Sequence, residues 1–385
     1  MRRKNKKKEA ICQAKARGCA VKNLLAAAAL IPTIGAGINC HALGPAKETE
    51  VRFAYMSYRD WQAGQQDRMK INAPMTWFRT AAGEHVEVEG SFVLDAVSGA
   101  SPLYHDTLSG ASKKGIEDNR RAGDISATYF LESYSVTLGL SSSSEDDYDS
   151  NGVSAELRHW TPDNNTLFQL GVSASDDSIT STNDPSLDES KHSFGVGFGV
   201  SQILDKESVV QSNITLASAD GYLTDSYKSM DLRPRSRDQF AWLNRYILYI
   251  PEQESSLHLD YRYFQDSWGI SAHTFEAAYY QPLGSAWLVR PRLRYYTQDK
   301  AEFYSNLFPP DDPGSGFFSA DQRLSGFGSV TAGLRIERQL GDKVFGNISY
   351  DYIRQQGSLE SFSPGSPNLD PFNASILGIG MYMKW

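Results

Sequence analysis

From about residue 50 onward, apolar and polar residues alternate with a period of two, in segments about as long as a membrane-spanning strand. In residues 285–298, for example, Val289, Leu293 and Tyr295 alternate with three arginines. Period two places each set on its own face of a strand. Sixteen segments of this kind can be recognised, near residues 51–59, 69–80, 84–96, 123–131, 133–142, 150–160, 165–175, 191–203, 207–218, 237–250, 254–265, 270–281, 285–298, 326–340, 343–356 and 373–385.

The connections between these segments alternate in length. Even-numbered segments mostly end in tight turns rich in Gly, Pro, Asp and Asn, whereas most odd-numbered segments lead into long polar loops. Bacterial outer-membrane barrels have this asymmetry, with the short turns in the periplasm. The sequence therefore predicts an all-β fold: a transmembrane antiparallel up-and-down β-barrel of about 16 strands, with short periplasmic turns and long extracellular loops. The long loops are 97–122, 143–149, 176–190, 219–236, 299–325 and 357–372.

A soluble β-sandwich is the alternative interpretation, because its strands alternate too. The aromatic residues favour the barrel, since they concentrate at strand ends, where interfacial girdles would need them. They are Tyr55, Trp77, Trp160, Tyr246, Tyr249, Tyr279, Tyr280, Tyr295, Tyr296, Tyr350 and Tyr352.

The last segment ends on an aromatic residue, Trp385, after alternate apolar positions that begin at Leu377. This resembles the C-terminal signature of outer-membrane strands that the barrel-assembly machinery recognises. Only a closed sheet pairs every backbone N–H and C=O of strands in lipid. We therefore expect two partners, outer-membrane lipid and the assembly machinery.

The first 42 residues read as an export signal. They contain nine of the 38 Lys and Arg residues and a single acid. Within them, the basic segment is followed by an apolar stretch at residues 24–38 and then by a Cys-His-Ala site before Leu43. A single anchoring helix is the alternative, although the apolar stretch is short and contains Pro32. The prediction is a signal peptide over 1–42, a barrel domain over 43–385 and a location in the outer membrane of a Gram-negative cell.

Composition excludes several classes of protein. The balance of 38 basic against 46 acidic residues argues against a nucleic-acid partner. An aromatic fraction of 12% argues against disorder. All three cysteines lie in the leader, so the mature barrel would contain no disulfide.

Four motifs resemble those of one proteobacterial family. They are Ser91 to Pro102 (Ser-Phe-Val-Leu-Asp-Ala-Val-Ser-Gly-Ala-Ser-Pro), Asp118 to Arg121, Asp147 to Ser150, and Tyr227 to Pro234. The chain resembles, over most of residues 50–385, the family catalogued as domain of unknown function number 3570. The resemblance implies an exported barrel and supplies no catalytic residue.

The sequence offers little that is typical of catalysis. No histidine pair has metal-ligand spacing, and no Gly-x-Ser-x-Gly elbow occurs, so we expect no enzyme activity, no metal and no cofactor. His258 and Asp260 share a strand face, which is more typical of a hydrogen-bonded pair than of a hydrolytic site. The acidic segment 145–152 is either a solvated loop or a Ca²⁺ site.

The arginines are the strongest candidates for function. If Val289 and Leu293 face lipid, their strand neighbours face the lumen, because a charge on the lipid face costs about 2–4 kcal/mol at the midplane. The candidate lumen residues are Arg262, Arg290, Arg292, Arg294 and Arg335, with Glu87, Glu89, Asp95 and Asp260. They either select anions across a water-filled pore or form a ladder of salt bridges.

The function expected from these features is a porin-like passive channel for small polar solutes, among them anions, because sixteen strands usually leave an aqueous channel. The alternative is a non-conducting barrel that acts as a scaffold or receptor for a periplasmic or extracellular partner. Whether the long loops fold inward or outward is left open.

Overall fold

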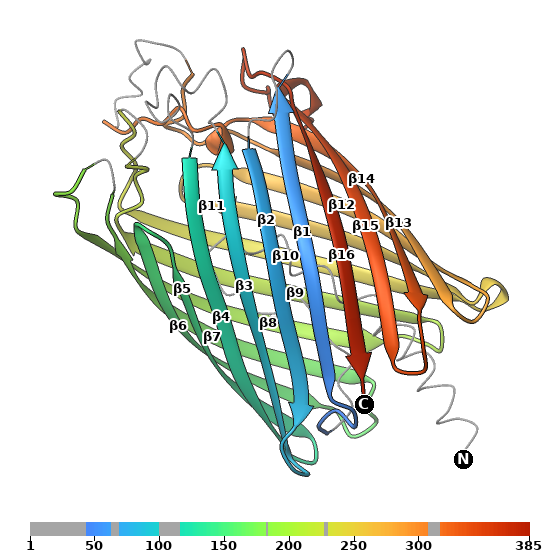
Figure 1. Ribbon diagram of the computed structural model, residues 1–385. Coiled ribbons are helices and arrows are strands. Elements are labelled where there is room, and N and C mark those ends of the chain that lie inside the picture. The colour runs from blue at the N-terminus through green and yellow to red at the C-terminus, as the bar shows by residue number, and fades with distance from the viewer. Residues whose placement is uncertain (1–43, 63–68, 100–115, 182–183, 227–229, 307–315) are drawn as a thin grey trace.

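The protein is a closed antiparallel barrel of sixteen strands (Figure 1). The computed structural model describes residues 44–62, 69–99, 116–181, 184–226, 230–306 and 316–385. Each strand pairs with its neighbours in sequence, and β1 pairs with β16 to close the barrel. The strands are β1 (Glu50–Gln62), β2 (Met69–Ala81), β3 (Val86–Gly99), β4 (Ile116–Phe130), β5 (Tyr134–Ser144), β6 (Tyr148–Trp160), β7 (Thr166–Ile179), β8 (Glu189–Ile203), β9 (Ser208–Gly221), β10 (Ser236–Ile250), β11 (Ser255–Asp266), β12 (Ser271–Leu283), β13 (Trp287–Gln298), β14 (Phe327–Gln339), β15 (Val344–Gln356) and β16 (Phe372–Lys384).

The prediction of a sixteen-stranded up-and-down barrel is confirmed, and each predicted segment overlaps one strand. Several predicted loops are shorter than expected, because the strands beside them are longer. β4 already begins at Ile116, paired with Gly99, and β5 and β6 are joined by residues 145–147 alone. Hairpin pairing extends these strands into polar sequence, because each added residue pair satisfies backbone N–H and C=O groups. The predicted leader, residues 1–42, lies outside the described residues.

The two ends of the barrel differ. At one end, which we call the short-turn end, successive strands are joined by tight turns; the other is the loop end, at the top of Figure 1. Gly83 and Gly284 lie in short turns at φ +98° and +62°, where L side chains are strained. The backbone of Trp385 exchanges hydrogen bonds of 2.8 and 3.0 Å with Thr49, so both ends of the described chain meet at the short-turn end.

The outer face of the barrel is apolar. The alternate positions that point away from the interior include Leu138, Leu140 and Leu293, whose side chains are 57–61% exposed. Similar residues follow around the whole circumference: Phe53, Phe92, Ile125, Val153, Leu170, Phe194, Leu216, Leu259, Phe275, Leu334, Ile348 and Ile379. The helical segments among the described residues are three-residue 3-10 turns, too short to cross a bilayer.

The prediction that all the strand-end aromatics form a girdle is only partly right. Period two sends alternate residues to opposite faces, so pairs such as Tyr279 and Tyr280 cannot both point outward. Leu138, Leu259 and their neighbours point outward, and the alternation then places some of the predicted girdle residues inside the barrel. They are Trp77, Trp160, Tyr249, Tyr280 and Tyr296.

Candidate functional site in the barrel interior

Small side chains line one wall of the interior. In one register row across β5 to β9, every inner position is small: Gly139, Ser154, Ser173, Gly195 and Ala217. The row on the loop side is of the same kind, with Ser141, Gly152, Ser175, Ser193 and Ala219. We call these ten residues the small-residue wall. A hollow of about 740 Å³ lies against β3 to β7 and is bordered by Ser141, Gly152 and Ser175.

Charged side chains line the opposite wall, on β10 to β15. One register row carries Arg245, Asp260, Glu276 and Arg294 on four successive strands. Arg245 donates two hydrogen bonds to Asp260, of 2.7 and 2.8 Å, and Arg294 donates one of 2.7 Å to Glu276. Two-pronged pairs of this kind fix both side chains in place. Four of the charges on this wall therefore neutralise one another in a ladder.

The next rows toward the short-turn end continue the ladder. Arg292 donates to Asp351 at 2.7 Å and lies 3.6 Å from Glu276. Arg335 donates to Glu337 at 3.1 Å, and the side chains of both are 5% exposed. Arg290 is directly opposite Arg335 in the register, and its Nη1 lies 3.4 Å from the Tyr280 hydroxyl. We call the charged residues described so far the charged wall: Arg245, Asp260, Glu276, Arg290, Arg292, Arg294, Arg335, Glu337 and Asp351.

Arg262 differs from its neighbours. It follows the inner phase of β11 and is exposed, and its guanidinium lies 5.5 Å from the ring of Phe264. Among the described residues, Arg262 forms no ion pair with a carboxylate. It is thus the predicted arginine with the most exposed charge.

The three predicted acidic residues on β3 lie apart from the charged wall. Glu87 accepts a hydrogen bond of 2.7 Å from the backbone N–H of Ala46, and Glu89 accepts one of 2.9 Å from the Trp77 indole. Asp95 lies 3.9 Å from Arg120. The structure therefore brings Asp260 to the arginines, and places Glu87, Glu89 and Asp95 on a different part of the circumference.

Sequence reasoning missed the partners of the predicted lumen residues. Arg245, Glu276, Glu337 and Asp351 all carry the inner phase of their strands. Periodicity could have placed them inside the barrel. Their pairing depends on the strand register, which periodicity leaves undetermined.

His258 and Asp260, the pair considered from the sequence, each have other partners. Asp260 is engaged by Arg245, whereas His258 lies 3.4 Å from the Ser256 hydroxyl and packs on the Tyr280 ring with a centroid distance of 4.3 Å. Nor do the described residues include a cluster of three His, Cys, Asp or Glu side chains suited to a metal ion, in segment 145–152 or elsewhere.

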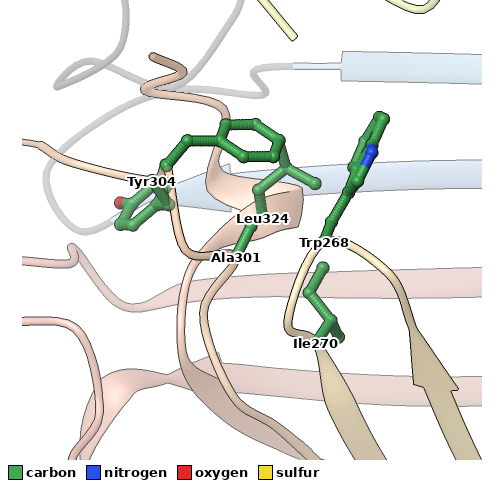
Figure 2. Packing of buried hydrophobic residues seen from close by; sticks show 6 residues of the cluster. Trp268, Ile270, Ala301, Tyr304 and Leu324 are labelled. Carbon is green, nitrogen blue, oxygen red and sulfur yellow. The ribbon is translucent and has the colours of Figure 1, made fainter. Parts of the chain in front are cut away.

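A packed cap stands at the loop end above the charged wall. Its apolar cluster joins the β11–β12 turn to the segments that follow β13 and precede β14, as Figure 2 shows. The members are Trp268, Ile270, Ala301, Phe303, Tyr304 and Leu324. Burial in this cluster raises the pKa of the Tyr304 phenol above its ordinary value.

The cap is tied to the interior side of the barrel. Gln298, at the end of β13 on its inner face, donates hydrogen bonds of 3.0 and 2.7 Å to the carbonyls of Arg323 and Ser325. Arg237, on the inner face of β10, lies 4.3 Å from the Trp268 ring. The described part of loop 299–325 therefore leans inward, which answers one question that the sequence left open.

The last loop behaves in the opposite way. Tyr295, on the outer face of β13, donates a hydrogen bond of 2.6 Å to the carbonyl of Leu359, and Phe362 packs on His273 at 4.3 Å. Residues 357–362 thus fold outward over β12 to β14.

Comparison with known proteins identifies a family without an assigned activity. The family profile described as "Protein of unknown function (DUF3570)" matches residues 105–192 and 182–368. No curated protein matches the sequence.

Several solved structures have a similar architecture at low identity. The siderophore receptor PirA from Acinetobacter baumannii is 10% identical over 81% of this chain and 53% of the receptor, with a TM-score of 0.43. CdiB from the same organism is 9% identical over 87% of this chain and 60% of CdiB, with a TM-score of 0.49. The outer membrane protein OpdK from Pseudomonas aeruginosa is 9% identical over 88% of this chain and 99% of OpdK, with a TM-score of 0.44. The chain therefore spans little more than half the length of the first two proteins.

Proposed function

The chain belongs to the DUF3570 family of proteins of unknown function, and from the geometry of its barrel we propose that it is an outer-membrane channel for small polar solutes. The proposal combines a membrane location, an open interior and a weak preference for anions. Each part is supported by a separate feature of the molecule.

The apolar outer face supports the membrane location. A water-soluble protein rarely exposes a contiguous apolar surface of more than a few hundred Å², yet here Leu138, Leu216, Leu293 and their neighbours encircle the barrel. Closure of the sheet pairs the backbone polar groups that lipid cannot satisfy. We therefore assign the short-turn end to the periplasm and the loop end to the cell exterior, with export directed by residues 1–42.

The small-residue wall is the observation that carries the channel proposal. Small barrels are filled by their inward side chains, whereas sixteen strands enclose more space. Gly, Ser and Ala at ten adjacent inner positions of β5 to β9 lack the volume to fill that space. Their hydroxyls and exposed peptide groups suit water, and small polar solutes would pass along this wall.

The charged wall contributes more to rigidity than to selection. Most of its guanidinium groups are engaged by Asp260, Glu276, Glu337 or Asp351, so their fields largely cancel. This favours the ladder hypothesis over a free row of arginines. Arg262 lies beside this wall, is exposed and forms no ion pair with a carboxylate among the described residues, which adds a modest positive charge and a weak attraction for anions.

A second candidate function is that of a receptor or scaffold. The specific observation in its favour is the cap, where a backbone bridge between Leu232 and Phe318 and the packing of Leu223 on the apolar cluster join loop 219–236 to loop 299–325. Arg233 links these loops further, because it contacts Asp231 on its own loop at 2.7 Å and Asp321 on the other at 3.0 Å. An ordered surface of this kind suits binding of an external partner.

Conductance of the purified protein in a planar bilayer distinguishes the two functions. We expect discrete steps, and a lower conductance when Ser154→Trp narrows the passage at the small-residue wall. The matched control is Leu138→Trp, which adds the same side chain on the outer face. A folded, inserted protein that conducts nothing would refute the channel and support the receptor function.

A further inference from the structure

The last loop forms a strap on the outer wall of the barrel. Residues 357–363, which we call the outer strap, follow β15 and lie over outward positions of β12, β13 and β14 at the loop end. Thr297 shares the outward phase of Tyr295, yet its side chain is fully buried because the outer strap covers it. A Cβ atom at Gly328 would collide with the Leu359 carbonyl, so the outer strap rests directly on the backbone of β14.

Hydrogen bonds hold the outer strap in place and satisfy its backbone. Tyr295 donates a hydrogen bond of 2.6 Å to the carbonyl of Leu359. The Glu360 carboxylate accepts hydrogen bonds of 3.0 and 2.9 Å from the backbone N–H groups of Phe362 and Ser363. These backbone groups therefore have partners within the protein, as a segment that enters the lipid requires.

An apolar ring projects from the outer strap. Phe362 is 59% exposed, and its ring packs on the His273 imidazole with a centroid distance of 4.3 Å. His273 is itself held on the outer wall, since its Nδ1 lies 3.0 Å from the Tyr261 hydroxyl. These contacts fix Phe362 against the outside of the barrel, away from the lumen and the cap.

Phe362 lies at the loop-end edge of the apolar outer face. On β12, Phe275 points outward and is 43% exposed, and His273 is the next outward position toward the loop end. Phe275 is directly opposite Tyr261 on β11 and Tyr295 on β13, so tyrosines flank it in one register row. Tyrosines of this kind mark the boundary of the hydrocarbon in outer-membrane barrels. On these strands, the outer strap therefore begins where the hydrocarbon would end.

We propose that the outer strap docks on the outer leaflet of the membrane, with Phe362 inserted into the lipid just beneath the headgroups. Its ring continues the outward apolar surface that Phe275 and Leu293 form on β12 and β13. Glu360 keeps the backbone of the outer strap hydrogen-bonded while the ring is in lipid. The preceding long loop packs inward in the cap, so the two loops that flank β14 and β15 serve different surfaces.

This inference rests on the membrane location proposed above, and it is independent of conduction. An outer strap docked on lipid would stay docked whether the lumen is open or closed. The positions that test it lie outside the lumen, so the channel and the lipid contact can fail separately.

A spin label at residue 362 tests the proposal. All three cysteines lie in the leader, so the full-length protein with these changed to Ser takes a single nitroxide at Phe362→Cys. In phospholipid bilayers, its collision rate with oxygen, which concentrates in lipid, is compared with that of a water-soluble nickel chelate. We expect the oxygen-to-nickel ratio to lie close to that at the outward reference Leu293→Cys. It should be well above the ratio at Met230→Cys, an exposed apolar position in loop 219–236.

A second label position controls for the loss of the ring. Ser361→Cys, at an exposed neighbour, leaves Phe362 in place and should also give a ratio above that at Met230→Cys. Adding Phe362→Ser to this variant should lower the ratio, because the inserted ring no longer holds the outer strap on the lipid. Heat-modifiable mobility on gels verifies that each labelled protein is folded.

Three outcomes would overturn the proposal. Ratios at 361 and 362 as low as at 230, with the label at 293 in lipid, would place the outer strap in water. Dipolar broadening between labels at 362, with both collision rates low, would assign the outer strap to contact with a second copy. A low ratio at 293 as well, in folded protein, would refute the membrane location itself.

Discussion

Arg292 on β13 reaches across the whole of β14 to donate a 2.7 Å hydrogen bond to Asp351 on β15. The residue of β14 directly between them is Gly333. A Cβ atom at this position would collide with the Asp351 carboxylate and lie 3.4 Å from Nε of Arg292. The glycine therefore makes room for an ion pair that ties three strands together.

Gly333→Ala should weaken the folded barrel. The added methyl group displaces the Asp351 carboxylate from Arg292, whose side chain is 9% exposed, and we expect a loss of about 1–3 kcal/mol. The temperature at which the protein loses its compact gel mobility measures the effect. Gly341→Ala is the control, because a Cβ there meets nothing within 4 Å. Equal melting of the two variants would show that the ion pair contributes little.

The sequence was sufficient to predict the strands of this fold because their signal is local. Alternation at Val289, Leu293 and Tyr295 specifies a strand and its two faces without knowledge of any other strand. The alternation of short turns and long loops then orders the strands into a closed up-and-down sheet. Hairpin extension was not foreseen, since residues such as Ile116 become extended through pairing with a neighbour.

The interior was less predictable because it depends on register. The sequence places Arg292 inside, but its pairing with Asp351 requires two strand registers to be known. Likewise, the small-residue wall arises only when Gly139, Ser154 and Ser173 come level on three strands. The packing around Trp268 depends on residues still farther apart in the sequence, since most of its partners lie more than thirty residues away.

A charge on the outer face should damage assembly far more than a change inside. Leu293 is 57% exposed on the outer face, so Leu293→Arg places a guanidinium in lipid, at a cost of about 2–4 kcal/mol. Arg262→Ser alters an exposed inner position and should assemble normally. The fraction of heat-modifiable protein recovered from membranes compares the two. Equal defects would mean that the inner and outer faces of β11 or β13 have been exchanged.

Removal of Trp268 should loosen the cap without affecting the barrel. Trp268 is 3% exposed, donates a 2.9 Å hydrogen bond to the carbonyl of Ser236 and meets Phe303 edge-on at 5.3 Å. Truncation of a buried Trp to Ala costs about 3–5 kcal/mol, which the local packing would lose. We expect faster proteolysis of loop 299–325 on intact cells, at unchanged barrel mobility. Trp287→Ala, at a half-exposed position, is the control. Resistance of the loop in the Trp268→Ala variant would show that the cluster is not what holds it.

Export should remove the basic leader. The apolar stretch at residues 24–38 and the Cys-His-Ala site predict cleavage after Ala42. N-terminal sequencing of protein from the outer-membrane fraction should therefore begin near Leu43. A full-length species in the soluble periplasmic fraction would refute both the signal and the membrane location.

Arg262 should be the main source of any anion preference in the lumen. Its charge is exposed and has no carboxylate partner among the described residues, whereas Arg292 and Arg294 are neutralised by Asp351 and Glu276. Arg262→Ser should therefore lower the anion-to-cation permeability ratio, and Arg262→Lys should preserve it. We expect a change of less than about threefold, because salt screens charges beyond about 8 Å at physiological ionic strength. Reversal potentials in a salt gradient measure the ratio, and the effect should grow as the salt is diluted. Arg338→Ser, which removes a charge from the outer face, controls for net charge. An unchanged ratio in Arg262→Ser at low salt would mean that ions do not pass beside the charged wall.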